Sequence, residues 1–291
     1  MSDVYRPRRS VLYMPGANER ALEKAKGLAA DALILDLEDA VAPDDKPAAR
    51  DRVAAALASG DYGHRELVAR VNGLDTAWFA SDLQAVAPAG PDAVLVPKVG
   101  SAQDVRGIEA ALDAAGAPDH TRLWAMLETP SAIVRATEIV SASERLTGFV
   151  MGTNDLVQEL RAGRVAGRGP LLPALAWALL AVRDAGKVIV DGVFNDLDDA
   201  EGFEAECRQG RELGFDGKTL IHPKQLETCN RVFAPSASEV ADAREVIEAW
   251  EAAQAAGRGG VVTVRGRMIE HLHVEEARRT VTQADAIAAL G

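Results

Sequence analysis

The stretch that decides the fold is RLWAMLETPSAIVRATEIVSASERLTGFVMGTND, residues 122–155. It begins with one short apolar run, RLWAMLET (122–129), and ends with another, TGFVMGTND (147–155); both finish in polar or charged residues. Near-continuous apolar runs are typical of strands that are buried on both faces of a parallel sheet. A helix-like segment separates the two runs, as parallel neighbours require.

The same alternation of strand and helix recurs along most of the chain. Apolar positions at i, i+3 and i+4 predict amphipathic helices between the strands, for example over 18–30, 46–58 and 101–116. Eight repeats of strand and helix favour a (β/α)₈ TIM barrel, with a doubly wound open sheet as the alternative. The predicted strands are SVLYMPG (10–16), ALILDLEDAV (32–41), ELVARVNG (66–73), AVLVPKVG (93–100), RLWAMLET (122–129), TGFVMGTND (147–155), VIVDGVFND (188–196) and GKTLIHP (217–223).

The pattern changes after Pro235, where strand–helix alternation stops. We therefore expect a barrel catalytic domain over 1–235 and a C-terminal helical lid or appendage over 236–291, not an independent domain. The expected pieces of the lid are a helix over 236–256, a flexible GRGG joint over 257–260, a short hairpin or extended piece over 261–270 with Arg-Gly at its turn, and a closing helix over 273–290.

Composition excludes several classes of protein. The chain has 291 residues, and 32 Lys and Arg against 44 Asp and Glu give a net charge of −12. Such a charge argues against sequence-independent nucleic-acid binding, although a local pocket can still bind an anion. Cys207 and Cys229 are too few for a disulfide framework, and we expect free thiols. The N-terminus shows no signal peptide and no apolar stretch is long enough for a membrane helix, so we expect a cytoplasmic protein with no membrane partner.

Polar side chains end nearly every predicted strand, and the active site of a barrel is built at those ends. They are Asp36, Glu38, Asp39, Arg70, Asn72, Lys98, Glu128, Asn154, Asp155, Asp191, Asn195 and His222. Glu128 and Asp155 end consecutive strands and should be neighbours. Such a pair either shares a proton, binds a hard divalent cation, or merely begins the two helices that follow. Oxygen ligands without cysteine favour Mg²⁺ over zinc.

Two further features suggest anion binding. Arg70 ends its strand, where it either holds a carboxylate, thioester or enolate oxygen or pairs internally with Glu38 or Asp39. The two interpretations are compatible. The loop and helix start at MPGANERALEKA (14–25) form a weak candidate phosphate site. GRVAGRG (163–169) lacks the residues of a P-loop, and HLHVEE (271–276) is better explained as helix surface than as metal ligands.

A set of motifs in a fixed order carries a family resemblance. The chain resembles the citrate lyase β-subunit-like (CitE-like) branch of the HpcH/HpaI aldolase family from about residue 9 to 235, and more weakly over 236–291. Within that branch it looks closest to malyl-CoA lyases and their thioesterase paralogue. The motifs are RSVLYMPGANERALEKA (9–25), DLEDAVAPDDKPAAR (36–50), RVNGLD (70–75), PKVG (97–100), MLETP (126–130), GTNDL (152–156), DGVFND (191–196) and GKTLIHPKQL (217–226).

The resemblance implies specific roles. Glu128 and Asp155 match Mg²⁺ ligands (Mn²⁺ being a possible substitute), and Arg70 matches an arginine on the acyl thioester. Glu38 and Asp39 match the supporting carboxylates of the active site. The residues at positions that contact coenzyme A (CoA) in the family are Tyr13, Asn18, Lys24, Ile221 and His222, with Asn18 replacing a frequent arginine.

The C-terminal segment departs from the family pattern. Where many relatives have an aspartate that reaches a neighbouring subunit's site, this chain reads GRMIE and places Glu270. The resemblance therefore implies a homo-oligomer, a trimer or hexamer, whose lid completes a neighbour's site. The longer carboxylate either preserves proton transfer in C–C cleavage or shifts the enzyme toward thioester hydrolysis.

Three functions follow from the resemblance. The leading one is a Mg²⁺-dependent acyl-CoA lyase that cleaves or forms the C–C bond of a 3-hydroxy-dicarboxylyl-CoA such as malyl-CoA or citramalyl-CoA. Acetyl- or propionyl-CoA and glyoxylate or pyruvate would be the other reactants. The second is a (3S)-malyl-CoA thioesterase that uses the same site. The third is a citrate-lyase-like β subunit that acts on a carrier-bound thioester.

Overall fold

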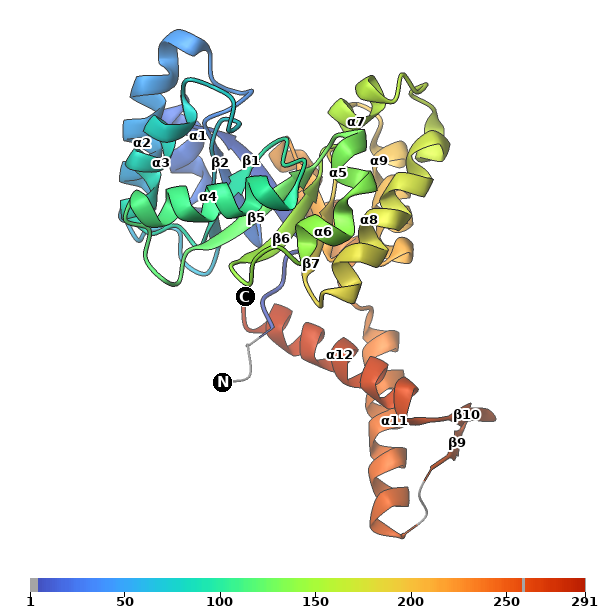
Figure 1. Ribbon diagram of the computed structural model, residues 1–291. Helices are drawn as coiled ribbons and strands as arrows, with labels where there is room; N and C mark the ends of the chain where they lie inside the picture. Colours follow the sequence, from blue (N-terminus) through green and yellow to red (C-terminus); the bar gives the residue numbers. More distant parts are fainter. Residues whose placement is uncertain (1–4, 258–259, 291) are drawn as a thin grey trace. The chain divides into compact units, whose positions relative to one another are not determined.

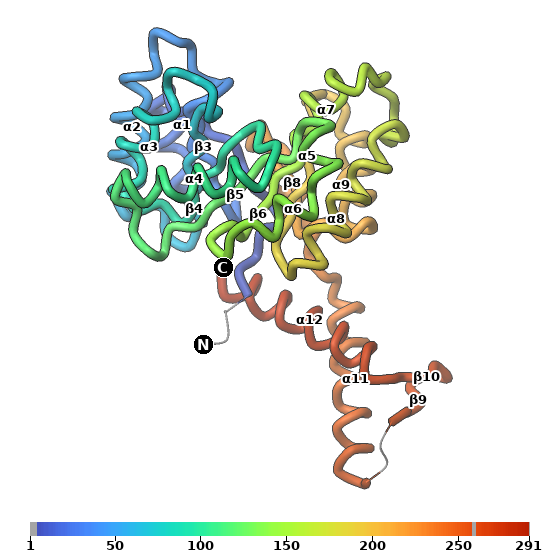
Figure 2. Tube along the Cα trace, in the orientation of Figure 1, coloured from blue at the N-terminus to red at the C-terminus, as the bar shows by residue number. Residues whose placement is uncertain are grey.

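Eight parallel strands close into a barrel in the order β1 to β8 (Figures 1 and 2), in a computed structural model that describes residues 5–257 and 260–290. This confirms the predicted TIM barrel and excludes the open sheet, because β1 pairs in parallel with both β2 and β8. The strands are β1 (Ser10–Pro15), β2 (Ala32–Asp36), β3 (Glu66–Arg70), β4 (Ala93–Val96), β5 (Arg122–Leu127), β6 (Leu146–Met151), β7 (Val188–Asp191) and β8 (Gly217–Leu220).

Helices follow the strands and surround the barrel (Figure 1). Several begin at side-chain caps, since Asn18, Ser101, Thr129 and Asp199 each accept a backbone N–H of the first turn. The helices of the barrel are α1 (Glu19–Ala25), α2 (Lys46–Ala58), α3 (Phe79–Val86), α4 (Ala102–Ala114), α5 (Pro130–Val134), α6 (Ala136–Val140), α7 (Thr153–Glu159), α8 (Leu172–Asp184) and α9 (Ala200–Leu213), with α10 (Leu226–Phe233) after β8. Short 3₁₀ turns are η1 (Pro43–Asp45), η2 (Ala87–Ala89), η3 (Ala166–Leu171) and η4 (Pro223–Gln225).

Several element boundaries differ from the sequence-based prediction, since most strands end earlier than expected; the strand expected over 32–41, for example, ends at Asp36. The helix expected over 18–30 ends at Ala25, shortly before Gly27, a residue that weakens helices. The strand expected over 147–155 ends at Met151, and Asp155 lies in the first turn of α7 instead of at a strand end. An acidic residue is favourable at that position because the amino end of a helix carries partial positive charge.

Inward-facing side chains of the strands fill the barrel. Val11, Ile34, Leu95, Trp124 and Val150 belong to one buried apolar cluster. Gly148 gives the Trp124 ring its place, because a Cβ at residue 148 would overlap that ring. This filled interior leaves the loops at the carboxyl ends of the strands as the place for a binding site.

The chain forms two compact units. One of them contains the residues from Arg8 to Asn230 and holds the barrel. The other unit contains α11 (Ala237–Ala255), a two-stranded hairpin of β9 (Val262–Val264) and β10 (Arg267–Ile269), and α12 (His271–Ala288). Arg265 and Gly266 have φ of 46° and 75°, which confirms the Arg-Gly turn and fits a tight hairpin. The domain boundary expected after residue 235 stays a prediction. So does the expectation that this segment contributes to the site of a neighbouring subunit.

The C-terminal unit has a core of its own, in which Trp250 and Ile269 pack with Val274. His271 begins α12 and is exposed, so HLHVEE belongs to a helix as predicted, although its Val274 is fully buried. The predicted joint over 257–260 includes residues 258 and 259, which lie outside the described residues. No helix in the described part of the chain has the length and apolar character needed to cross a membrane.

Candidate active site

A cavity of about 430 Å³ opens at the carboxyl ends of the barrel strands. It brings together nine of the predicted site residues, from seven different strands or the loops after them. These are Tyr13, Asp36, Asp39, Arg70, Glu128, Asn154, Asp155, Asn195 and Ile221. The convergence agrees with the rule that barrel enzymes build their sites at this end.

Glu128 is the buried carboxylate of this cavity. It follows β5, is 3% exposed, and its Oε1 accepts the backbone N–H of Lys98 at 2.7 Å. Burial raises the pKa of Glu128 to about 7; the Lys98 hydrogen bond opposes this shift, and the charge of Asp155 adds to it. A cation beside this carboxyl group would favour its ionised form and lower its pKa.

The surroundings of Glu128 fit a divalent cation. In the described part of the chain, no cluster of three or more His, Cys, Asp or Glu side chains is arranged to hold a metal. Glu128 and Asp155 line the same cavity, and Mg²⁺ is commonly held by one or two carboxylates with water and substrate oxygens completing its shell, so their role as metal ligands stays a prediction that this lining permits. Gly152 makes room for Glu128, because a Cβ at residue 152 would overlap the Glu128 side chain.

We expect Gly152→Ala to weaken Mg²⁺ binding by at least tenfold, because the added methyl displaces the Glu128 carboxylate. The matched control is Gly107→Ala in α4, where a Cβ meets no atom within 4 Å. That control should stabilise the fold by about 1 kcal/mol, since alanine is the better helix former. Calorimetric titration with Mg²⁺ measures the effect, and equal affinity in the two variants contradicts the assignment.

Binding of Mg²⁺ should depend on pH because the proton and the metal compete for Glu128. With the pKa of Glu128 at about 7, the carboxyl is mostly protonated below pH 7 and ionised above it. We expect the apparent dissociation constant of Mg²⁺ to rise about tenfold for each pH unit below 7 and to level off above pH 8. Titrations between pH 5.5 and 8.5 measure this; a flat profile in the native protein would count against Glu128 as a ligand.

Arg70 is enclosed by carboxylates. Its Nε and Nη2 donate to the two oxygens of Asp36, both at 2.6 Å, and its Nη1 lies 2.7 Å from Oε2 of Glu38. Asp39 is farther, at 3.6 Å, and the guanidinium lies 4.7 Å from the centre of the Tyr13 ring. The internal pairing considered from the sequence is therefore present, and it places the guanidinium at the cavity wall.

The backbone of the loop after β2 binds the Asp36 carboxylate that pairs with Arg70. Oxygens of Asp36 accept the backbone N–H groups of Glu38 and Ala40, at 2.9 and 3.1 Å. Burial raises the pKa of Glu38 to about 8, with Arg70 opposing the shift and Asp39 adding to it. Glu38 is thus a carboxyl group with a raised pKa next to the cavity, a feature that is frequent at functional sites.

Two lysines support the site: Lys98, which the sequence indicates only as a polar strand end, and Lys46, which it does not indicate. Lys46 is buried and donates to the carbonyl oxygens of Leu37 and Glu38 at 2.8 and 3.1 Å and to Asn72 Oδ1 at 2.7 Å. Lys98 has φ of 53°, a conformation that lysine rarely adopts, and this directs its N–H at Glu128. The motifs DDKPAAR and PKVG contain both lysines, but nothing in the sequence indicates a buried ammonium or a left-handed residue.

Only some of the residues expected to contact CoA line the cavity. Tyr13 and Ile221 line it, and burial raises the pKa of Tyr13, which keeps its hydroxyl protonated. Asn18, Lys24 and His222 do not line it. Asn18 Oδ1 caps α1 by accepting the N–H of Ala21 at 3.0 Å, and His222 Nδ1 accepts the N–H of Lys224 at 3.1 Å. Their contacts with CoA stay predictions, as does the phosphate site at the start of α1.

Comparison with protein families decides the relationship. The model described as HpcH/HpaI aldolase/citrate lyase matches residues 9–223, and a model described as a C–C bond lyase of the TIM-barrel fold matches 171–288. The chain belongs to the HpcH/HpaI aldolase/citrate lyase family. It is an enzyme of this family, and the resemblance inferred from its motifs is confirmed.

Individual relatives span almost the whole chain. A (3S)-malyl-CoA thioesterase of Cereibacter sphaeroides is 52% identical over 99% of both chains. The citrate lyase subunit beta of Escherichia coli is 41% identical over 96% of this chain and 94% of its own, and an L-malyl-CoA/beta-methylmalyl-CoA lyase of Cereibacter sphaeroides is 37% identical over 98% and 96%.

Among solved structures, the CitE protein of Mycobacterium tuberculosis in complex with magnesium, acetoacetate and coenzyme A is similar to this chain. It aligns with a TM-score of 0.77 and 30% identity, over 95% of this chain and 97% of that one. This likeness supports the barrel fold of the family in this protein.

Proposed function

We propose that this protein hydrolyses the thioester of a 3-hydroxy-dicarboxylyl-CoA of the (3S)-malyl-CoA type. The observation that carries the proposal is the full-length similarity, at 50–52% identity, to four proteins named (3S)-malyl-CoA thioesterase. The sequence alone ranked C–C cleavage first and hydrolysis second. The difference in similarity, 52% against 37% for a malyl-CoA lyase, reverses that order.

The geometry of the cavity supports a substrate of this class. Glu128 and Asp155 would hold Mg²⁺, with Mn²⁺ as a possible substitute, and leave coordination places for a hydroxyl and a carboxylate of the substrate. When bound, the metal would supply Lewis-acid stabilisation of negative charge on those oxygens. Arg70 at the cavity wall would hold the thioester oxygen, and Asp36 and Glu38 fix the orientation of its guanidinium.

Hydrolysis needs a water molecule and a group that takes its proton. The water oxygen forms a bond to the thioester carbon, the C–S bond breaks, and the CoA thiolate leaves and takes up a proton. We assign the base to Glu270, delivered by the C-terminal segment of a neighbouring subunit, with Glu38 and Asp39 as supporting carboxylates. Glu270 lies between β10 and α12, where its backbone N–H donates to His273 Nδ1 at 3.0 Å.

The C–C lyase remains the second candidate because the same cavity suits it. In that reaction Arg70 would stabilise the enolate oxygen of acetyl- or propionyl-CoA, and the other product would be glyoxylate or pyruvate. Its supporting observation is the 37% identity to an L-malyl-CoA/beta-methylmalyl-CoA lyase. A subunit that acts on a carrier-bound thioester rests on the 41% identity to citrate lyase subunit beta.

The decisive experiment is to incubate the full-length protein with malyl-CoA and Mg²⁺, with EDTA as control, and to resolve the products. Free CoA and malate are expected. Acetyl-CoA and glyoxylate would instead establish the lyase. Turnover of a carrier-bound thioester alone would establish the subunit function and exclude both alternatives. Sedimentation of the same sample tests the expected homotrimer or hexamer.

A further inference from the structure

A second cavity, of about 730 Å³, adjoins the candidate active site. The two cavities share one wall, formed by Thr153, Asn154, Val193 and Asn195. The second cavity continues between η3 and α9, away from the carboxylates Glu128 and Asp155, neither of which lines it. The shared wall therefore decides how far a molecule in the active site can extend on this side.

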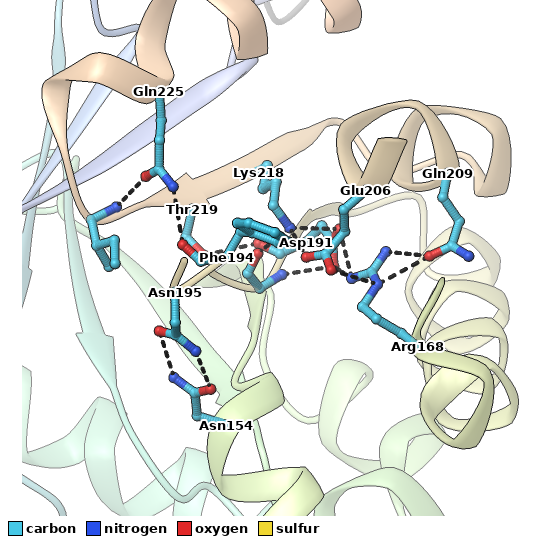
Figure 3. Close-up of polar contacts among 12 residues, drawn as sticks. Asn154, Arg168, Asp191, Phe194, Asn195, Glu206, Gln209, Lys218, Thr219 and Gln225 are labelled. Atoms are coloured by element: carbon cyan, nitrogen blue, oxygen red, sulfur yellow. Dashed lines mark hydrogen bonds and ion pairs between the residues drawn. The ribbon is translucent and has the colours of Figure 1, made fainter. Parts of the chain in front are cut away.

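Two amides close that wall. Asn195 Nδ2 donates to Asn154 Oδ1 at 2.7 Å, and Asn154 Nδ2 lies 3.3 Å from Asn195 Oδ1, so the side chains pair reciprocally (Figure 3). Arg164 adds a third contact, since its Nη1 donates to the same Asn154 oxygen at 2.9 Å. All three side chains are at the surface of the cavities, so no part of this closure is buried in the core.

Hydrogen bonds and ion pairs hold the backbone between Asp191 and Asn195, the segment that carries one of the two amides (Figure 3). Asp191 ends β7 and accepts Arg168 Nη1 at 2.7 and 2.9 Å and the fully buried Lys218 Nζ at 3.1 Å. Lys218 also donates to the Gly192 carbonyl at 2.5 Å and to Glu206 at 2.7 Å. These bonds fix the start of the loop that leads to Asn195.

Further bonds fix the rest of that loop and the segment before η3. Gln225 Nε2 donates to the Phe194 carbonyl at 3.0 Å, one residue before Asn195. Gln209 Nε2 donates to the Gly167 carbonyl at 2.8 Å, three residues after Arg164. The backbone on both sides of the shared wall is therefore anchored. Within residues 5–257 and 260–290, the amide side chains that close the wall are held by one another and by Arg164.

We propose that the Asn154–Asn195 pair is a specificity-determining partition, which limits the size of the group on the hydroxyl-bearing carbon of the substrate. The inference rests on the proposed substrate class. Asn154 directly precedes Asp155, so the pair stands beside the end of the substrate that the two carboxylates hold. While the pair is closed, a hydrogen fits on that carbon; once it opens, a larger branch extends into the second cavity.

Removing one amide tests the partition. Asn195→Ala should raise kcat/KM for the thioester with a methyl or carboxymethyl group on the hydroxyl-bearing carbon, relative to the unbranched thioester, by at least tenfold. A change of about tenfold or more in kcat/KM is typical when a binding pocket discriminates between substrates that differ by one small group. Asn195 is exposed, so the variant should fold. Leu197→Ala is the control, because Leu197 belongs to the same loop, is exposed and lines neither cavity.

An unchanged ratio in Asn195→Ala, or the same change in Leu197→Ala, overturns the partition. A binding assay separates this outcome from failure of the proposed function. Thermal shifts with Mg²⁺ and the free hydroxy-dicarboxylic acid, with and without the methyl branch, report the fit without turnover. A larger thermal shift with the branched acid in Asn195→Ala supports the partition even if no thioester is hydrolysed. If neither the kinetic ratio nor the thermal shift increases for the branched compound, the partition is rejected.

Discussion

Replacement of Glu128 or Asp155 by alanine is expected to lower Mg²⁺-dependent turnover by on the order of 10³-fold or more. Metal-based stabilisation of transition-state charge is worth several kcal/mol, and each 1.36 kcal/mol is a factor of ten in rate. The two side chains share the wall of one cavity, and Glu128 is almost fully buried there. Among the described residues, no group of three or more His, Cys, Asp or Glu side chains is arranged to hold a metal in their place.

The experiment compares kcat/KM and the Mg²⁺-induced rise in Tm for each variant. Glu128→Gln keeps the shape but not the charge, and it should also lose the metal and the pH dependence of metal binding. Glu138→Ala, an exposed carboxylate on α6, is the control and should keep both properties. Unchanged turnover in either alanine variant contradicts the site.

The second large effect concerns Arg70. Arg70→Ala should cost about 3–5 kcal/mol of folding free energy, because it leaves the buried Asp36 and the partly buried Glu38 without their cation. Arg70→Lys keeps a positive charge but cannot donate to both Asp36 oxygens while also contacting Glu38. We expect this variant to fold and to lose at least 10²-fold in kcat/KM.

A matched substitution separates structure from catalysis. Arg50 donates from Nε to the buried Asp82 at 2.6 Å and does not line the cavity. Arg50→Lys should therefore lower the free energy of unfolding without changing kcat/KM. If Arg70→Lys behaves in the same way, Arg70 is a structural residue, and its assignment to the thioester oxygen is wrong.

The strands of this barrel could be predicted because each is a short apolar run with polar residues after it. Runs such as AVLV and VIVD suit both faces of a buried parallel sheet, although the polar residues after them do not mark where the strand ends, and both strands end earlier than expected. Helix ends were also hard to predict, as α1 shows, because fraying and weak helix formers compete there at small energies. Asp155 was misplaced for the same local reason, since the change from strand to helix occurs at Gly152.

Part of the candidate site also followed from the sequence. Glu128, Asp155 and Arg70 stand after consecutive or nearby strands, and closure of a parallel barrel brings such positions to one mouth. Asn195 was recognised as a polar strand end, but its pairing with Asn154 was not predicted. The amide pair joins residues 41 apart along the chain, and no local pattern encodes that contact.

The sequence by itself determined the type and order of elements, the barrel, the family and the residue types at the strand ends. These depend on periodicity, turn residues and the order of motifs, all of which are local along the chain. Only the tertiary structure decided the environment of each charge: the raised pKa of Glu128, the carboxylates around Arg70, the buried Lys46 and Lys218, and the wall between two cavities. The reason is physical, because burial and electrostatic interaction depend on distances between residues that are remote in sequence.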